Sequence, residues 1–344
     1  MNAGLIVIIL LLVLSILGIP IYLALGIGTL VALNMADMPF IVLPQKLFAG
    51  MNSSSLLAIP FFMLAGNIMS RSITGKLIDV SNALIGWIKG SLAVVTVLAS
   101  ALFGAISGSG VATASAVGGT TIPAMKEEGY PDHFAAAISG IAAILGPIIP
   151  PSITLIVYAS ITDLSVSKLF VGSVIPGILM AVGLIIYALF YGKKNDLPAH
   201  ERKSAKEVLL IFKDSIWALL MPVIILGGIF GGIFTPTESA AVAVVYALLV
   251  SLLIYKDIKI KDIPGIFVDG AISTATILML VGISKSSGYV ITTSGLPHQV
   301  LEVFSSFTNS TVVILLLLNI LFLVIGMLME ANAAIIMMTP ILLP

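Results

Sequence analysis

The sequence predicts an all-α polytopic membrane protein. Of its 344 residues, 59% are hydrophobic and only 9% are charged, whereas soluble domains carry about 25% charged residues. Long uncharged stretches recur along the chain, and a spanning helix needs about 20 apolar residues. Such a chain could not cover its apolar side chains with polar surface in water, so a lipid bilayer is the solvent that suits it.

The uncharged stretches are the candidate membrane segments. In chain order they are 1–36, 47–70, 90–125, 134–162, 169–192, 215–237, 239–255, 270–284, 303–329 and 331–344. The first is too long for a secretory signal and lacks a basic region, so we interpret it as mature membrane structure rather than as a cleaved leader. Residues 90–125 exceed one crossing and predict a crossing plus a further segment.

Composition and missing motifs exclude several functions. The net charge is zero, which gives no reason to expect a nucleic acid partner. The chain has no cysteine, so disulfides and thiolate metal sites are excluded. It has no H-E-x-x-H, no G-x-S-G and no P-loop, and its three histidines lie far apart. We therefore expect no enzyme, no catalytic residue and no cofactor.

One polar segment divides the chain. Residues 193–214 hold ten of the 32 charged residues, six of them basic, and basic loops stay in the cytoplasm. We expect a cytoplasmic loop there, between an N-terminal half (1–192) and a C-terminal half (215–344). Residues 256–262, with three lysines, come two crossings later and land on the same side.

The two halves look alike. Each has an apolar helix, a short polar turn, an amphipathic stretch and a long apolar run that ends in a Gly-rich or polar segment. Gly104 and Gly326 are 222 residues apart, and Ile73 and Leu296 are 223 apart. Transporters often contain repeats of opposite topology with the binding site at their interface, although hydrophobic strings also resemble one another by chance. The second half stops inside its matching segment, about 326–344, so the chain looks C-terminally incomplete.

Residues 103–125 (FGAISGSGVATASAVGGTTIPAM) are the first segment that suggests a site. A run so rich in Gly, ending in Pro, is a poor continuous helix, and broken backbone at membrane depth survives only when it is buried in protein or lines a cavity. We predict a re-entrant hairpin over about 104–125 with its tip at 107–110; a small-residue packing face is the alternative. The residues that could contact a ligand there are Ser107, Gly108, Ser109, Gly110, Thr113 and Ser115.

Residues 146–152 (GPIIPPS) predict a broken helix within 134–162. Three prolines remove three backbone donors and free carbonyl oxygens. Such oxygens are hard ligands that suit Na⁺, as in discontinuous transporter helices. A packed proline kink is the alternative.

Three further segments carry polar groups. Glu330, Asn332 and Thr339 could line a second hairpin over about 326–344, because intramembrane acids are costly and usually functional; an interfacial Glu330 is equally compatible with the sequence. Asn67 and Arg71 end an apolar helix, where the guanidinium could pair with a substrate carboxylate or anchor the helix at the interface. Thr235 or Thr237 is expected to cap a helix, with Glu238 at its positive end.

These segments together resemble the large membrane subunit of tripartite ATP-independent periplasmic (TRAP) transporters, the DctM-like family. The matching stretches are 59–70 (IPFFMLAGNIMS), 107–125, 146–152, 231–240 (GGIFTPTESA) and 326–344. The resemblance implies an elevator-type fold of the ion transporter superfamily. It implies Na⁺-driven uptake of a C4-dicarboxylate, a sialic acid or a similar carboxylate across a bacterial or archaeal inner membrane.

The resemblance also implies partners and sites. The partners are a periplasmic substrate-binding protein (P type) and a small four-helix membrane subunit (Q type). Na⁺ is the coupling ion and the one metal expected, between the first hairpin and the broken helix. Its implied ligands are Ser107, Ser109, Gly146, Ile149, Pro150 and Ser152. A related carrier that works without a binding protein, a channel, a passive scaffold and an intramembrane enzyme are the alternatives.

Overall fold

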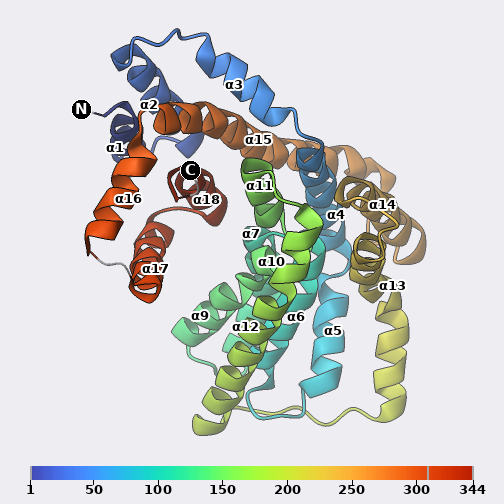
Figure 1. Ribbon diagram of the computed structural model, residues 1–344. Coiled ribbons are helices and arrows are strands. Elements are labelled where there is room, and N and C mark those ends of the chain that lie inside the picture. The colour runs from blue at the N-terminus through green and yellow to red at the C-terminus, as the bar shows by residue number, and fades with distance from the viewer. Residues whose placement is uncertain (1, 308–309, 343–344) are drawn as a thin grey trace. The chain divides into compact units, whose positions relative to one another are not determined.

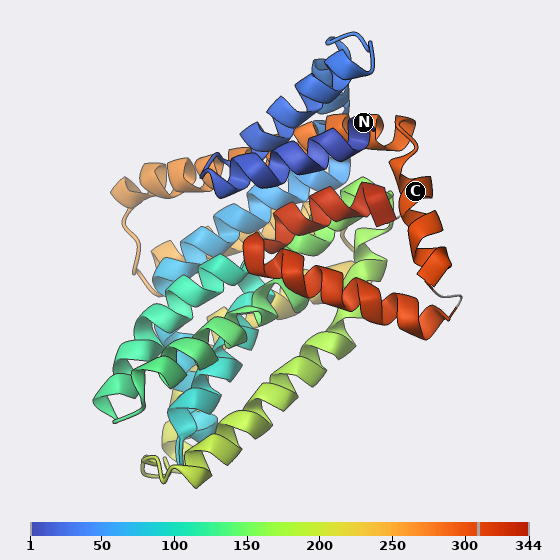
Figure 2. The same ribbon diagram turned by 90° about the vertical axis from the view of Figure 1, so that its left-hand side faces the viewer.

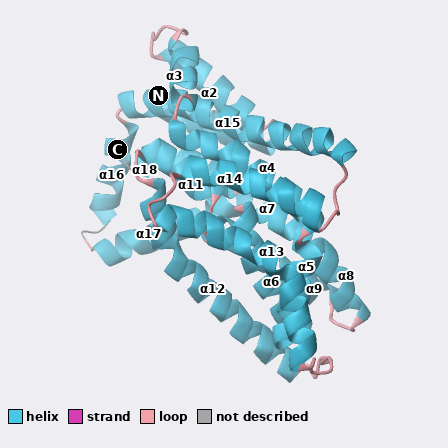
Figure 3. Ribbon diagram, turned by 90° about the vertical axis from the view of Figure 1, so that its right-hand side faces the viewer, coloured by secondary structure: helices cyan, strands magenta, loops and turns pink. Residues whose placement is uncertain are grey.

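The computed structural model describes residues 2–307 and 310–342, and this part of the chain is helical throughout, with no strand (Figure 3). The all-α prediction is therefore confirmed. The helices are α1 (Ala3–Ile16), α2 (Ile21–Met35), α3 (Val42–Met51), η1 (Ser54–Leu57), α4 (Ala58–Ser72), α5 (Thr74–Ile85), α6 (Ser91–Ser107), α7 (Gly110–Thr113), η2 (Ala114–Gly118), α8 (Gly119–Glu127), α9 (Asp132–Ala143), α10 (Leu145–Ile148), α11 (Ile153–Thr162), α12 (Val166–Lys194), α13 (Ala205–Phe230), α14 (Pro236–Leu249), η3 (Val250–Ile254), η4 (Ile260–Asp262), α15 (Ile263–Thr293), α16 (Leu296–Phe307), α17 (Thr311–Leu328) and α18 (Ala331–Leu342).

Several helices of the described chain are long enough to cross a membrane. Among the described residues four helices are long and apolar enough to cross a bilayer, or up to six if two interrupted helix pairs each count as one span. On α12 the side chains of Ile175, Leu179 and Phe190 are each about two-thirds exposed. Apolar side chains exposed along a whole helix suit lipid rather than water. The chain is therefore a multi-pass membrane protein.

The chain forms two compact units, and each takes segments from both halves of the sequence. Unit 1 comprises the described residues of Met1–Leu56, Val157–Leu164 and Ser273–Pro344, and unit 2 comprises Leu57–Ile156 and Ser165–Ile272. Within the polar segment 193–214, the part outside helices is only 195–204. Helix α13 begins directly after it because Ser204 and Glu207 form a capping box.

Helix α6 is the centre of unit 2. Most of its residues are buried, and it packs against α4, α5, α9, α10 and α12 (Figures 1 and 2). A helix that is apolar and small on every side suits such a central position. The rings of Phe134 on α9 and Tyr191 on α12 stack with centroids 3.6 Å apart beside it. The C-terminal end of α6, where the first predicted site lies, packs against α10, because a Cβ added to Gly104 would lie 2.8 Å from the Gly146 Cα.

Unit 1 is built around α1, α2 and the second part of α15. Val7, Leu25 and Val290 are fully or almost fully buried in one apolar cluster there. The hydroxyls of Thr29 and Ser287 lie 2.6 Å apart inside it, which pairs two polar groups that burial would otherwise leave unsatisfied. Helix α15 is therefore held by α2 on one side, and its Ser286 hydroxyl donates to the Leu43 carbonyl of the α3 segment.

Candidate functional site

The first predicted break lies where the sequence places it. Helix α6 ends at Ser107, Gly108 has φ +62°, Ser109 is extended and α7 begins at Gly110. The chain then turns back, because α6 contacts α7, η2 and α8. A left-handed Gly with no Cβ makes the turn possible. The turn lies at the predicted tip, 107–110, but the arm that precedes it is the whole of α6 (Ser91–Ser107) rather than a segment that begins at 104. The re-entrant hairpin over about 104–125 remains a prediction.

The second predicted break interrupts the next helix. Helix α10 ends at Ile148, Ile149 is extended, and α11 begins at Ile153 after a cis Pro150–Pro151 bond. Neither proline has an N–H, so the carbonyls four residues earlier lose their helical donors. Gly146 is one of these residues.

Ser152 repairs part of this loss. Its hydroxyl lies 2.5 Å from the Pro147 carbonyl, to which it donates, and it accepts from the Leu155 N–H at 3.2 Å. The hydroxyl thus works as a cap at the start of α11. Its role as an ion ligand remains a prediction.

The two breaks meet in unit 2. The Ile153 N–H donates to the Gly108 carbonyl at 3.2 Å. A Cβ added to Gly108 would lie 2.6 Å from the Pro151 carbonyl oxygen, and one added to Gly146 would lie 2.7 Å from that of Ser109. Residues 107–110 and 146–152, which helices α8 and α9 separate along the chain, are therefore in direct contact.

Neutral oxygen atoms line this junction. The Ser107 and Thr113 hydroxyls lie 3.4 Å apart, and the Thr113 hydroxyl donates to the Ser109 carbonyl at 2.7 Å. Thr113 Oγ1 would lie 2.8 Å from a Cβ on Gly146. Ser107 and Thr113 are almost fully buried. Carbonyl and hydroxyl oxygens of this kind are the ligands that hard cations take, and they carry no formal charge of their own.

Helix α4, which carries Asn67 and Arg71, packs against the hairpin tip one residue before Asn67, since a Cβ added to Gly66 would lie 3.2 Å from Ser107 Cα. Arg71, one turn further on, turns to α15. The Arg71 guanidinium donates to the Asp269 carboxylate at 2.9 Å, and both side chains are half exposed. A Cβ on the neighbouring Gly270 would lie 3.6 Å from the Asn67 amide nitrogen. Arg71 thus has an internal carboxylate as its partner, and its predicted contact with a substrate remains a prediction.

Glu330 and Asn332 belong to unit 1. The chain is extended at Met329, between α17 and α18. The exposed Glu330 carboxylate accepts from the backbone and side-chain amides of Asn332, at 3.2 Å and 2.7 Å. Both residues therefore lie at a third helix break. The second hairpin over about 326–344 remains a prediction, and Leu343 and Pro344 of that segment lie outside the described residues.

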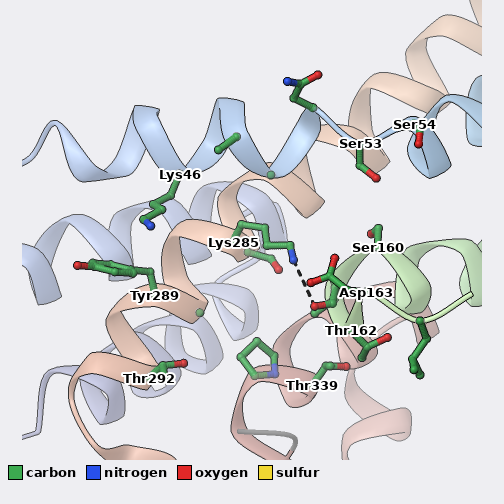
Figure 4. Close-up of a pocket in the computed structure, with 18 residues that line it drawn as sticks. Lys46, Ser53, Ser54, Ser160, Thr162, Asp163, Lys285, Tyr289, Thr292 and Thr339 are labelled. Atoms are coloured by element: carbon green, nitrogen blue, oxygen red, sulfur yellow. Dashed lines mark hydrogen bonds between the residues drawn. The ribbon is translucent and has the colours of Figure 1, made fainter.

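Thr339 lines a cavity of about 980 Å³ in unit 1 (Figure 4). Two lysines that the sequence analysis did not select, Lys46 and Lys285, line the same cavity. Lys285 could have been found, because it lies deep in the apolar stretch of α15 and charges at such positions are rare and usually functional. Lys46 carries no such signal.

The fold and the helix breaks at 108–109 and 149–152 define the class of protein. It is a multi-pass membrane protein in which two helices are interrupted next to polar oxygen atoms. The family model described as "Tripartite ATP-independent periplasmic transporter, DctM component" matches residues 8–344. The chain belongs to this family, as the resemblance suggested, and the family is a transporter permease.

Characterised relatives agree. The chain is 40% identical to the C4-dicarboxylate TRAP transporter large permease protein DctM of Pseudomonas aeruginosa, over 87% of this chain and 70% of the relative. It is 36% identical to the isethionate TRAP transporter permease protein DctMQ of Oleidesulfovibrio alaskensis, over 95% and 52%. It is 35% identical to the sialic acid TRAP transporter large permease protein SiaM of Vibrio cholerae, over 87% and 70%.

Proposed function

We propose that this chain is the large permease subunit of a Na⁺-coupled TRAP transporter that takes up a small organic anion across a bacterial or archaeal inner membrane. The observation that carries the proposal is the contact between the hairpin tip at 107–110 and the broken helix at 146–152. Relatives named for C4-dicarboxylates, isethionate and sialic acid support a small organic anion as the substrate.

Sodium binding follows from the oxygens at this contact. Proline leaves the Gly146 carbonyl without its helical donor, and the Ser109 carbonyl and the Ser107 hydroxyl lie on the facing hairpin. A Na⁺ ion bound there would satisfy the Gly146 carbonyl, which the helix break leaves without its helical donor. We propose Ser107, Ser109, Gly146, Ile149, Pro150 and Ser152 as its ligands or immediate supports.

The substrate would lie next to the ion. Gly108, Gly110 and Thr113 at the hairpin tip are the proposed neighbours, because an anion beside a bound cation gains electrostatic stabilisation in a low-dielectric site. Coupling then has a physical basis, since each ligand improves the site for the other.

Element order supports an inverted-repeat architecture. The series α5, α6, an extended residue and α7 in the first half matches α16, α17, an extended residue and α18 in the second. Two such hairpins, entering from opposite sides, would give the elevator-type transport fold. A related carrier that works alone is the second candidate.

Partners follow from the family description, which calls the transporter tripartite. We propose a periplasmic binding protein that delivers the anion and a small membrane subunit that completes the membrane complex. The name DctMQ of one relative, of which this chain covers 52%, supports the second of these.

Uptake of radiolabelled carboxylates into proteoliposomes tests the proposal. Protein reconstituted with both partners should take up its substrate only with an inward Na⁺ gradient. Ser107→Ala and Ser109→Ala should raise the Na⁺ concentration needed for half-maximal uptake, because each removes an oxygen or its support. Ser81→Ala is the matched control: this hydroxyl is also buried and donates within its own helix, at 2.7 Å.

Two results would contradict parts of the proposal. Uptake that is indifferent to the Na⁺ gradient removes the coupling. Uptake of equal rate without the binding protein favours the carrier that works alone.

A further inference from the structure

The cavity of about 980 Å³ in unit 1 is a second polar site, and no residue of 107–110 or 146–152 lines it. It lies between α3, the end of α11 with the turn after it, α15 and α18 (Figure 4). Its volume falls at the upper end of the range of about 300–1,000 Å³ that is usual for ligand pockets. Its lining is rich in lysine, serine and threonine side chains, so the ligand that fits it is polar.

Two ammonium groups reach this cavity. The Lys285 amine donates to the Ile161 carbonyl at 3.2 Å, and the Lys46 amine lies 4.3 Å from the centre of the Tyr289 ring. Neither lysine takes part in an ion pair within the described part of the chain. An ammonium has three donors and no acceptor, so Lys285 keeps donors for a ligand. Asp163 is the acidic residue of the lining, which leaves a formal excess of one positive charge.

Gly50 positions the Lys285 side chain. A Cβ on Gly50 would lie 2.6 Å from Lys285 Cγ and 2.7 Å from its Cβ. The lysine stem therefore lies directly against the backbone of α3. The next residue, Ser286, donates its hydroxyl proton to the Leu43 carbonyl of the same helix, so α3 holds this part of α15 and the base of the lysine side chain.

Several hydroxyls of the lining can only accept a hydrogen bond from a ligand. Ser160, Thr162 and Thr339 each donate their proton to a carbonyl of their own helix, at 2.7, 2.8 and 2.6 Å. Their remaining capacity is the oxygen lone pair. Ser284 differs, because it is almost fully buried and its hydroxyl has no partner within the described residues.

This division of donors and acceptors selects a ligand class. A carboxylate accepts hydrogen bonds and suits the two ammonium groups. It offers nothing to the acceptor oxygens of Ser160, Thr162 and Thr339, whereas ligand hydroxyls can donate to them. A dicarboxylate without hydroxyls would carry one charge too many for the lining and would leave these acceptors unsatisfied.

We propose that this cavity binds a hydroxylated organic monocarboxylate of the sugar-acid class, with the Lys285 ammonium on the carboxylate and the serine and threonine oxygens on its hydroxyls, while Lys46 adds positive charge to the lining. The proposal rests on the organic-anion carrier function proposed above and narrows its substrate class. It assigns to unit 1 a second substrate site, in addition to the one proposed beside the Na⁺ ion.

Calorimetric titration of the purified protein in detergent tests the ligand class. The probes are D-gluconate, hexanoate, sorbitol and succinate, which separate the carboxylate from the hydroxyls and from a second charge. Gluconate should bind at least about tenfold more tightly than each of the others, because a site built around polar partners rejects analogues that lack them. Equal affinity for sorbitol or hexanoate, or binding of none of the probes, would overturn the proposal.

Variants test the residues. Lys285→Gln should weaken gluconate binding by about tenfold or more, as expected for a lost hydrogen bond to a charged group, and Lys285→Arg should weaken it less. Gly50→Ala keeps the lysine but should displace its stem, with a similar loss. Lys76→Gln is the matched control, since the Lys76 amine also lies over a tyrosine ring, that of Tyr255 at 5.4 Å, but away from this cavity.

The outcome can be separated from that of the carrier function. Na⁺-driven uptake that neither excess gluconate nor Lys285→Gln alters would overturn this inference and leave the carrier standing. Gluconate binding that is lost in Lys285→Gln, together with uptake that ignores Na⁺, would support this inference and overturn the coupling. Unliganded unfolding midpoints close to that of the native protein show that the variants are folded.

Discussion

Substitution of Gly108 by Ala tests the contact between the two helix breaks most directly. Gly108 has φ +62°, and its new Cβ would lie 2.6 Å from the Pro151 carbonyl oxygen and 3.1 Å from the Ile153 nitrogen. The left-handed conformation costs an Ala about 1–2 kcal/mol. Overpacking against backbone adds about 1–3 kcal/mol, so we expect a total loss of about 2–5 kcal/mol.

Substitutions at two other glycines separate the conformational cost from the overpacking cost. Gly129 has φ +82° with no atom within 4 Å of an added Cβ, so Gly129→Ala should cost the conformational part alone, about 1–2 kcal/mol. Gly119 is helical and equally open, so Gly119→Ala should be neutral or slightly stabilising. The difference in stability between Gly108→Ala and Gly129→Ala therefore measures how closely the broken helix approaches the hairpin tip.

The assay is thermal unfolding in detergent, followed by the fluorescence of Trp87 and Trp217, which both belong to unit 2. At about 2–4 °C per kcal/mol for a domain of 150–250 residues, Gly108→Ala should unfold about 2–12 °C below Gly129→Ala. A midpoint equal to or above that of Gly129→Ala would show that the two breaks are not in contact, and the proposed ion site would lose its geometric basis.

Three further predictions concern other parts of unit 2. Thr235→Ala removes the cap of α14 and should lower the free energy of unfolding by about 1 kcal/mol, measured by the same thermal assay; an unchanged midpoint would contradict the cap. Burial raises the pKa of the Glu128 carboxyl against the opposing effect of His200, so the folded state holds that proton more tightly than the unfolded state. This stabilisation is present below the ordinary pKa of a glutamate and is lost as the pH rises through the raised value. The comparison is between His200→Gln and the double variant His200→Gln/Glu128→Gln. The stability of the double variant relative to the single variant should increase as the pH rises from about 4 to about 8. A difference between their unfolding midpoints that does not vary with pH would refute this. Arg71→Gln and Asp269→Asn should each cost less than about 1 kcal/mol and leave the KM of uptake unchanged, as for an exposed ion pair; a KM raised by Arg71→Gln alone would instead show that the guanidinium binds substrate.

Local sequence signals predicted several features correctly. A threonine cap at Thr235 or Thr237, with Glu238 in the first turn, was predicted, and the structure shows that Thr235 is the cap and forms a full capping box with Glu238. The interruptions at 108–109 and 149–152 follow from glycine and proline, whose effects on the backbone act within one helical turn. These features could be predicted without knowing which other helices pack against the segment.

Such local signals could not predict which residues far apart in the chain contact each other. Arg71 pairs with a carboxylate 198 residues away, and Lys285 donates to a carbonyl 124 residues away. The capping role of Ser152 also depends on the path of the chain after two prolines, which residue types alone leave open. The hairpin tip and the broken helix were expected to meet only because the chain resembles a family.

Hydrophobicity, glycine and proline act on the backbone locally, so the residue types alone were enough to predict a helical membrane protein in which two helices break. The contact between the two breaks, the internal partner of Arg71 and the cavity shared by Lys46, Lys285 and Thr339 became visible only in the folded chain. The reason is physical: in the sequence of a membrane helix, the apolar residues that face lipid cannot be told from the apolar residues that face another helix. Which side faces another helix is settled by close packing between residues far apart in the chain.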